Sequence, residues 1–186
     1  HTVDFKKPFA IVIYHPVTTE PNNRESTEKL LKAVGDLNTQ AVWFWPNNDA
    51  GTAEIAKAIR IYREKGFLRN DKIRFVTDIL PEDFIALLKK SSVFVGNSSA
   101  GIKECSYLGV PAVNIGTRQQ GRLRGPNVLD VRNDSKAIKA AIEKQLRRGP
   151  YKPSLIYYRP GTSKKIADIL SKTDLYVQKK FYDHQS

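Results

Sequence analysis

The apolar residues of this chain alternate between short continuous runs and longer segments in which they recur every three to four positions. The continuous runs are rich in β-branched and aromatic residues, which is typical of parallel strands buried on both faces. We expect six such strands, at residues 9–15, 40–45, 72–77, 93–95, 111–115 and 127–131.

The segments between these runs carry apolar residues at helical spacing, so they predict helices that pack back on the sheet. Pro81 stands at a first helical position, and Gly66 and Gly109 stand where helices would end. Asp49 or Thr52 is expected to cap the second helix. The predicted helices cover residues 25–37, 52–65, 81–88, 100–108, 135–147, 163–170 and 175–182.

Strand and helix alternate about six times, with short loops and no internal repeat. This order predicts an α/β fold: a Rossmann-like, doubly wound parallel sheet of about six strands. One domain is the natural count for 186 residues, with residues 1–7 expected as a linker or tag remnant and residues 150–186 as a helical tail. Ligands of such sheets bind at the carboxyl ends of the strands. Polar residues gather there, at 15–19, 47–51, 97–99 and 116–122.

The composition narrows the class of protein. No apolar run approaches the roughly 18 residues that a membrane span needs, and the first residues lack signal-peptide architecture. Cys105 is the single cysteine, which excludes an intrachain disulfide and a cysteine zinc site and suits a reducing cytoplasm. Histidines at positions 1, 15 and 184 make no convincing metal cluster, so no metal is expected. The chain begins with His and contains no Met, which suggests a fragment or a processed product.

The net charge of +12 favours a polyanionic partner. Nucleic acid is the first candidate, but the basic residues are spread along the chain and never form a run of about five or more like charges. We interpret most of them as solvated helix faces. A small phosphate-bearing ligand is therefore favoured over nucleic acid.

Residues 93–122 combine the features of a phosphate site. Asn97, Ser98 and Ser99 precede a predicted helix, whose first turn offers unsatisfied N–H groups and the positive end of the helix dipole. Arg118 and Arg122 lie in a glycine-flanked loop after the next strand and can add charge-assisted contacts. The same spacing is equally consistent with Asn97, Ser98 and Ser99 being plain helix caps, and both interpretations stay open.

His15 ends a buried strand and is followed by Pro16, which places an imidazole suited to acid–base chemistry near neutral pH at the same edge. A structural hydrogen bond to a loop carbonyl is its alternative role. Glu104 lies five residues after Ser99, where a carboxylate can accept both hydroxyls of a ribose; a solvated surface glutamate is the alternative. The sequence motifs GxGxxG, GxxxxGK[ST] and GxSxG are absent, which argues against a dinucleotide site, a P-loop and a serine hydrolase.

The segment NSSAGIKECSYLGVPAVNIGTRQQGR strongly resembles the UDP-N-acetylglucosamine 2-epimerases. It is most similar to their hydrolysing branch, which makes N-acetylmannosamine for sialic-acid-type sugars. HPVTT and WPNNDAG match the same family in order and spacing, and the resemblance spans residues 9–180. Non-hydrolysing members typically carry Ser-Gly-Gly at the helix start and an Arg-x-x-Thr-Glu-Arg-Pro loop instead.

The resemblance implies the two-domain glycosyltransferase-B architecture, of which this chain resembles the C-terminal, nucleotide-binding half. Family members carry their catalytic Asp and Glu residues in the N-terminal half, so the isolated chain is expected to be inactive. The implied reaction is anti elimination of UDP across C1–C2 of UDP-GlcNAc to give 2-acetamidoglucal. Addition of water at C2 then yields N-acetylmannosamine and UDP. The scheme requires no cofactor, neither NAD nor a metal.

The resemblance also implies roles for individual residues. The catalytic residue beside the glycosidic oxygen and the diphosphate is His15. The residues implied in nucleotide binding are Asn47, Ser98 and Ser99 beside the diphosphate, Glu104 on the ribose, and Arg118 near the nucleotide. Further candidates are Thr18, Asn97 and Arg122.

The partners that the resemblance implies are UDP-GlcNAc or UDP, the N-terminal domain of the same enzyme and, at full length, further copies in a homo-oligomer. The expected location is the cytoplasm, without a membrane partner. Two alternatives stay open at this point. One is a stand-alone nucleotide-sugar sensor, and the other is a related epimerase that acts on a diamino-trideoxy or GDP-linked sugar.

Overall fold

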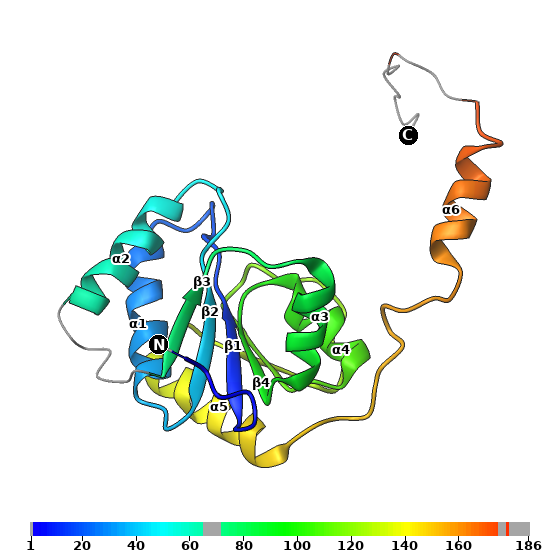
Figure 1. The fold of residues 1–186 in the computed structure, drawn as a ribbon. Helices are drawn as coiled ribbons and strands as arrows, with labels where there is room; N and C mark the ends of the chain where they lie inside the picture. The colour runs from blue at the N-terminus through cyan, green and yellow to red at the C-terminus, as the bar shows by residue number, and fades with distance from the viewer. Residues whose placement is uncertain (1, 65–71, 175–177, 179–186) are drawn as a thin grey trace.

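A computed structural model describes residues 2–64, 72–174 and 178. In chain order its strands and helices are β1 (Phe9–Ile13), α1 (Asn23–Gly35), β2 (Gln40–Phe44), α2 (Thr52–Glu64), β3 (Ile73–Val76), α3 (Pro81–Lys90), β4 (Val93–Gly96), η1 (Ser99–Gly101), α4 (Glu104–Leu108), β5 (Ala112–Ile115), β6 (Val128–Val131), α5 (Ser135–Arg148) and α6 (Thr162–Leu170). Strands and helices alternate along the chain, except that η1 is followed directly by α4, β5 directly by β6, and α5 directly by α6; the overall arrangement is seen in Figure 1.

The six strands form one sheet in the order β3-β2-β1-β4-β5-β6, and every neighbouring pair is parallel. From β1 the chain moves outward to β2 and β3, then returns to place β4 on the other side of β1. The carboxyl ends of β1 and β4 therefore meet at the point where the direction of winding reverses. This is the position at which open α/β sheets bind ligands.

Helices cover both faces of the sheet (Figure 1). On one face α1, α2 and α5 contribute the fully buried Leu30, Ile55 and Ile138 to a single core cluster. On the other face α3 and α4 contribute Leu88 and Cys105 to a second cluster. The predicted α/β class, with a Rossmann-like doubly wound parallel sheet, is confirmed.

One predicted helix differs from the structure. The segment expected as a single helix over residues 100–108 is a short 3₁₀ turn, η1, followed by the five-residue α4, with Ile102 and Lys103 in a turn between them. The Ser106 hydroxyl donates to the Ile102 carbonyl over 2.6 Å, a side-chain bond of the kind that bends helices. Gly109 ends α4 at φ 70°, as its position predicted. Apart from residue 178, the helix expected at 175–182 lies outside the described residues, and so does the stop at Gly66.

The close approach of β1 and β4 depends on Gly96, which has φ 142°. A Cβ atom built on Gly96 would lie 1.9 Å from the Ile13 carbonyl oxygen, so no side chain fits between the two strand ends.

The helix after α5 is not packed against the sheet. None of the residues of α6 is buried, and the helix stands apart from the sheet (Figure 1).

Candidate functional site

The side chain of Asn97 joins the ends of the two central strands. Its amide nitrogen donates to the His15 carbonyl oxygen over 2.8 Å, and its Oδ1 accepts from the His15 N–H, also over 2.8 Å. Asn97 is fully buried, so these bonds are shielded from water. Because its side chain pairs with the backbone of His15, two residues after β1 ends, Asn97 does not cap the following turn; Ser98 does, accepting from the Ala100 N–H over 3.4 Å.

The loop after β5 reaches the same point. Gln119, which is buried, donates to the Asn97 carbonyl oxygen over 2.8 Å, and Arg118 Nη1 donates to that oxygen over 3.3 Å. Gly116 and Gly121 flank this loop at φ 71° and 79°, and no atom lies within 4 Å of a Cβ built on either. The backbone at both glycines therefore borders open space, which leaves room for a ligand.

His15 is held in one protonation state. Its Nδ1 accepts from the Asn47 backbone N–H over 3.2 Å, so in the neutral ring the proton resides on Nε2. Burial is the main cause that lowers the pKa of His15 from 6.5 to about 4; the Arg118 charge lowers it further, and Asp49 acts in the opposite direction. At neutral pH the imidazole is therefore a neutral hydrogen-bond donor through Nε2, rather than the group titrating near pH 7 that its sequence position suggested.

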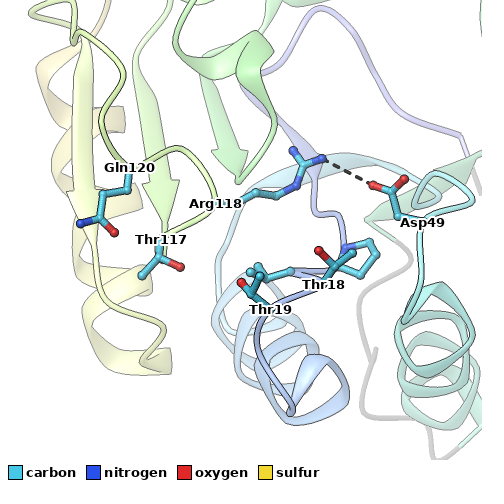
Figure 2. A pocket seen from close by; sticks show the side chains of 8 residues that line it. Thr18, Thr19, Asp49, Thr117, Arg118 and Gln120 are labelled. Atoms are coloured by element: carbon cyan, nitrogen blue, oxygen red, sulfur yellow. Dashed lines mark ion pairs between the residues drawn. The ribbon is translucent and has the colours of Figure 1, made fainter. Parts of the chain in front are cut away.

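A cleft of about 360 Å³ opens beside this hydrogen-bonded group (Figure 2). Its volume falls within the range of small-molecule sites. Arg118 and Asp49 face each other across it, with 3.7 Å between Nη2 and Oδ2. Near them the Thr117 hydroxyl donates to the Glu20 carboxylate. The cleft is lined by Pro16, Val17, Thr18, Thr19, Asp49, Thr117, Arg118 and Gln120.

The remaining candidates lie along the same edge without a direct bond to the His15–Asn97 group among the described residues. Ser98 and Ser99 form the start of η1 and are both half-buried. Glu104 is the first residue of α4, and its Oε2 is buried with no hydrogen-bond partner in the described part of the chain. Such an oxygen is costly unless a partner arrives. Arg122 is exposed and is not among the residues that line the cleft.

The structure therefore brings His15, Asn47, Asn97 and Arg118 into direct contact, with Thr18 on the wall of the adjoining cleft. Sequence reasoning missed two neighbours of this group. Asp49 was expected as a helix cap, yet its carboxylate accepts from Asn47 Nδ2 and faces Arg118. Gln119 was not considered at all, because a glutamine in a polar loop gives no local sign that it is buried.

Within the described ranges, no three His, Cys, Asp or Glu side chains are grouped closely enough to hold a metal ion. In the same ranges, none of the helices combines the length and apolar character needed to cross a bilayer.

The fold and the site together define a Rossmann-like domain with a polar ligand cleft at the switch point of its sheet. The model of the UDP-N-acetylglucosamine 2-epimerase family matches residues 1–171, so this chain belongs to that family. The resemblance drawn from NSSAG, HPVTT and WPNNDAG is thereby confirmed at the level of the family.

Individual relatives agree. A UDP-N-acetylglucosamine 2-epimerase from Neisseria meningitidis is 30% identical over 182 residues, which cover 94% of this chain and 47% of the relative. A hydrolysing UDP-N,N'-diacetylbacillosamine 2-epimerase from Legionella pneumophila is 30% identical over 176 residues, covering 94% and 45%. The chain spans about half the length of these curated relatives.

A solved structure supports the fold. UDP-GlcNAc 2-epimerase from Neisseria meningitidis, bound to UDP-GlcNAc, aligns with a TM-score of 0.65 at 14% identity over 92% of this chain and 46% of that one. The solved enzymes of this kind that the fold matches have the glycosyltransferase-B architecture.

Proposed function

We propose that this chain is the nucleotide-binding, C-terminal half of a hydrolysing UDP-N-acetylglucosamine 2-epimerase, folded as one Rossmann-like domain with a helical tail. The observation that carries the proposal is the contact between His15, Asn47, Asn97 and Arg118 at the carboxyl edge of β1 and β4. Four loops, those after β1, β2, β4 and β5, meet there beside a cleft of about 360 Å³.

The chemistry assigned to this half is the departure of UDP. As the bond between C1 of the sugar and the diphosphate oxygen breaks, negative charge grows on the diphosphate. Arg118, fixed by the Asn97 carbonyl, offers a cation to that charge. Backbone N–H groups at the start of η1 and the hydroxyls of Ser98 and Ser99 add donors. The five-residue α4 adds less of a helix dipole than an uninterrupted helix would.

His15 is assigned a place beside the departing oxygen. Its neutral ring, with Nδ1 engaged by Asn47, can offer the Nε2 proton to an oxygen of the leaving group. The arrival of a diphosphate would raise the pKa of His15, because a nearby negative charge favours the protonated form.

Glu104 is assigned to the ribose. Its Oε2 is buried and lacks a partner among the described residues, and a ribose hydroxyl would satisfy it. Since α4 begins at Glu104 and η1 begins at Ser99, a nucleotide that runs from the serines to Glu104 would follow the edge of the sheet from diphosphate to nucleoside.

In the proposal, the N-terminal half of the enzyme supplies the catalytic residues that this chain lacks. The chain covers about half of its curated relatives, and the resemblance assigns the residues that move protons at C2 to the N-terminal half. We therefore expect UDP binding without turnover by the isolated chain. As part of the same proposal, the complete enzyme acts in the cytoplasm and assembles with further copies of itself, with no nucleic acid or membrane as partner.

The hydrolysing branch is proposed because NSSAG and TRQQGR stand where non-hydrolysing members carry other residues. A second substrate has its own support, since a relative 30% identical to this chain is named as a hydrolysing UDP-N,N'-diacetylbacillosamine 2-epimerase. Competition binding against UDP separates the two: a preference for UDP-GlcNAc supports the first substrate, and a preference for the diacetylbacillosamine nucleotide supports the second.

Calorimetry with UDP tests the site. We expect binding by the unmodified chain, and a large loss of affinity in a variant that combines Ser98→Ala with Arg118→Ala. The matched control is Arg147→Ala, which removes the same charge from an exposed position on α5. No binding by the unmodified chain, or equal affinity in the double variant, would contradict the assignment. Epimerase turnover by the chain alone would contradict the division of roles between two halves.

A further inference from the structure

The cleft carries little net charge although the chain as a whole carries +12. Among the described residues that line it, Arg118 is the one basic side chain and Asp49 is the one acidic side chain. They point toward each other from the loops after β5 and β2 (Figure 2), with Nη2 and Oδ2 3.7 Å apart. A cleft proposed to receive a diphosphate thus already contains a carboxylate opposite its cation.

Arg118 does not need Asp49 for its orientation. Its Nη1 donates to the Asn97 carbonyl, and the neighbouring Gln119 fixes the loop to the same oxygen from a buried position. The 3.7 Å between Arg118 and Asp49 exceeds hydrogen-bond length, so their attraction is mainly electrostatic. The main effect of Asp49 on Arg118 is therefore to neutralise it.

Asp49 is held in place independently of Arg118. Its Oδ2 accepts from Asn47 Nδ2 over 2.5 Å, and its backbone carbonyl accepts from the Thr52 N–H at the start of α2 over 3.1 Å. The Thr52 hydroxyl donates in turn to the Asn47 carbonyl. The carboxylate is consequently held beside the cleft by the loop after β2 itself.

From these contacts we propose that Asp49 sets the affinity of the cleft for anionic ligands by competing with phosphate for Arg118. Without a ligand, Asp49 partly neutralises the arginine. An entering phosphate group must replace Asp49 as the partner of Arg118 while it lies close to the negative charge of that carboxylate. Asp49 thereby weakens binding of a nucleoside diphosphate and favours its release after bond cleavage. The inference rests on the proposed function, because it concerns the same cleft.

The test compares Asp49→Asn with the unmodified chain by calorimetry. Asparagine removes the charge but keeps an oxygen that can accept from Asn47. The matched control is Glu54→Gln, which removes one negative charge from an exposed position on α2. The probes are UDP, inorganic pyrophosphate and uridine. We expect UDP and pyrophosphate to bind about two- to fivefold more tightly to Asp49→Asn, the scale of a partly exposed ion pair, with uridine unchanged.

The effect must pass through Arg118. In an Arg118→Gln background, the gain from Asp49→Asn should fall to that of Glu54→Gln. The proposal is overturned if Asp49→Asn binds pyrophosphate equally or less tightly, or if the gain is the same in both backgrounds. Equal affinity of the unmodified chain for UDP and pyrophosphate would count against the proposed nucleotide site instead. That result leaves the comparison at Asp49 valid, since pyrophosphate alone reports on it.

Discussion

The protonation state of His15 makes a quantitative prediction about how stability depends on pH. Burial, followed by the charge of Arg118, lowers the pKa of His15 from 6.5 to about 4 in the folded chain. The Asn47 N–H bonded to Nδ1 opposes protonation of that nitrogen as well. Replacing His15 by glutamine removes the titrating ring and leaves a side-chain oxygen that can accept a hydrogen bond.

The sign follows from proton counting. Between about pH 4 and pH 6.5 the unfolded chain holds a proton on His15 that the folded chain has released, so stability rises with pH in this window. The contribution is complete above pH 6.5 and is lost as the pH falls through about 4. A difference of about 2.5 pKa units corresponds to about 3 kcal/mol in total, of which about 2 kcal/mol is lost by about pH 5.

Urea unfolding at about pH 8, 6 and 5 measures this contribution. We expect the loss of stability between pH 8 and pH 5 to be about 2 kcal/mol smaller in His15→Gln than in the unmodified chain. Carboxylates titrate in both proteins, so their effects cancel in the comparison. NMR titration of the imidazole signals measures the pKa of His15 directly. The chain contains three histidines, so few signals have to be assigned.

Two results would refute the reasoning. One is the same pH dependence in His15→Gln and in the unmodified chain. The other is an imidazole signal assigned to His15 that titrates near its ordinary value of 6.5. Either result would mean that burial and Arg118 do not hold the ring neutral, and the role of Nε2 as a neutral donor would fail with it.

Two further substitutions test how the site is supported. Gln119→Leu removes the buried bond to the Asn97 carbonyl and should cost about 1–3 kcal/mol in urea unfolding while weakening UDP binding; full UDP affinity would show that Gln119 does not position Arg118. Gly96→Ala places a Cβ 1.9 Å from the Ile13 carbonyl oxygen at φ 142°, so it should lower the free energy of unfolding by about 3 kcal/mol or more. The control Gly116→Ala, with nothing within 4 Å of its Cβ, should lower it by about 1–2 kcal/mol. Similar losses of stability in both variants would contradict the close approach of β1 and β4.

Much of the fold could be predicted from the chain because the relevant signals are local. A continuous apolar run such as residues 9–13 is buried on both faces, and its residue types show this without reference to any partner. Gly109 ends a helix because glycine readily adopts positive φ. The alternation of strands and helices placed the four polar clusters at carboxyl ends of strands, and short connections left few topologies to consider.

The internal details of the site depended on distances through space. Gln119 is buried against Asn97, and Asp49 contacts Arg118. In each case the two loops are more than twenty residues apart in sequence, so no local pattern predicts the contact. The same holds for Glu104, whose buried oxygen became visible only once α4 was placed.

The amino-acid sequence by itself therefore determined most of the elements, the α/β class and the family, since periodicity, turn residues and motifs are local properties of the chain. Only the tertiary structure decided that β4 lies beside β1, that His15 is neutral, and that Arg118 faces a carboxylate as well as the cleft. The physical reason is that strand order, desolvation and Coulomb attraction depend on which groups become neighbours in three dimensions.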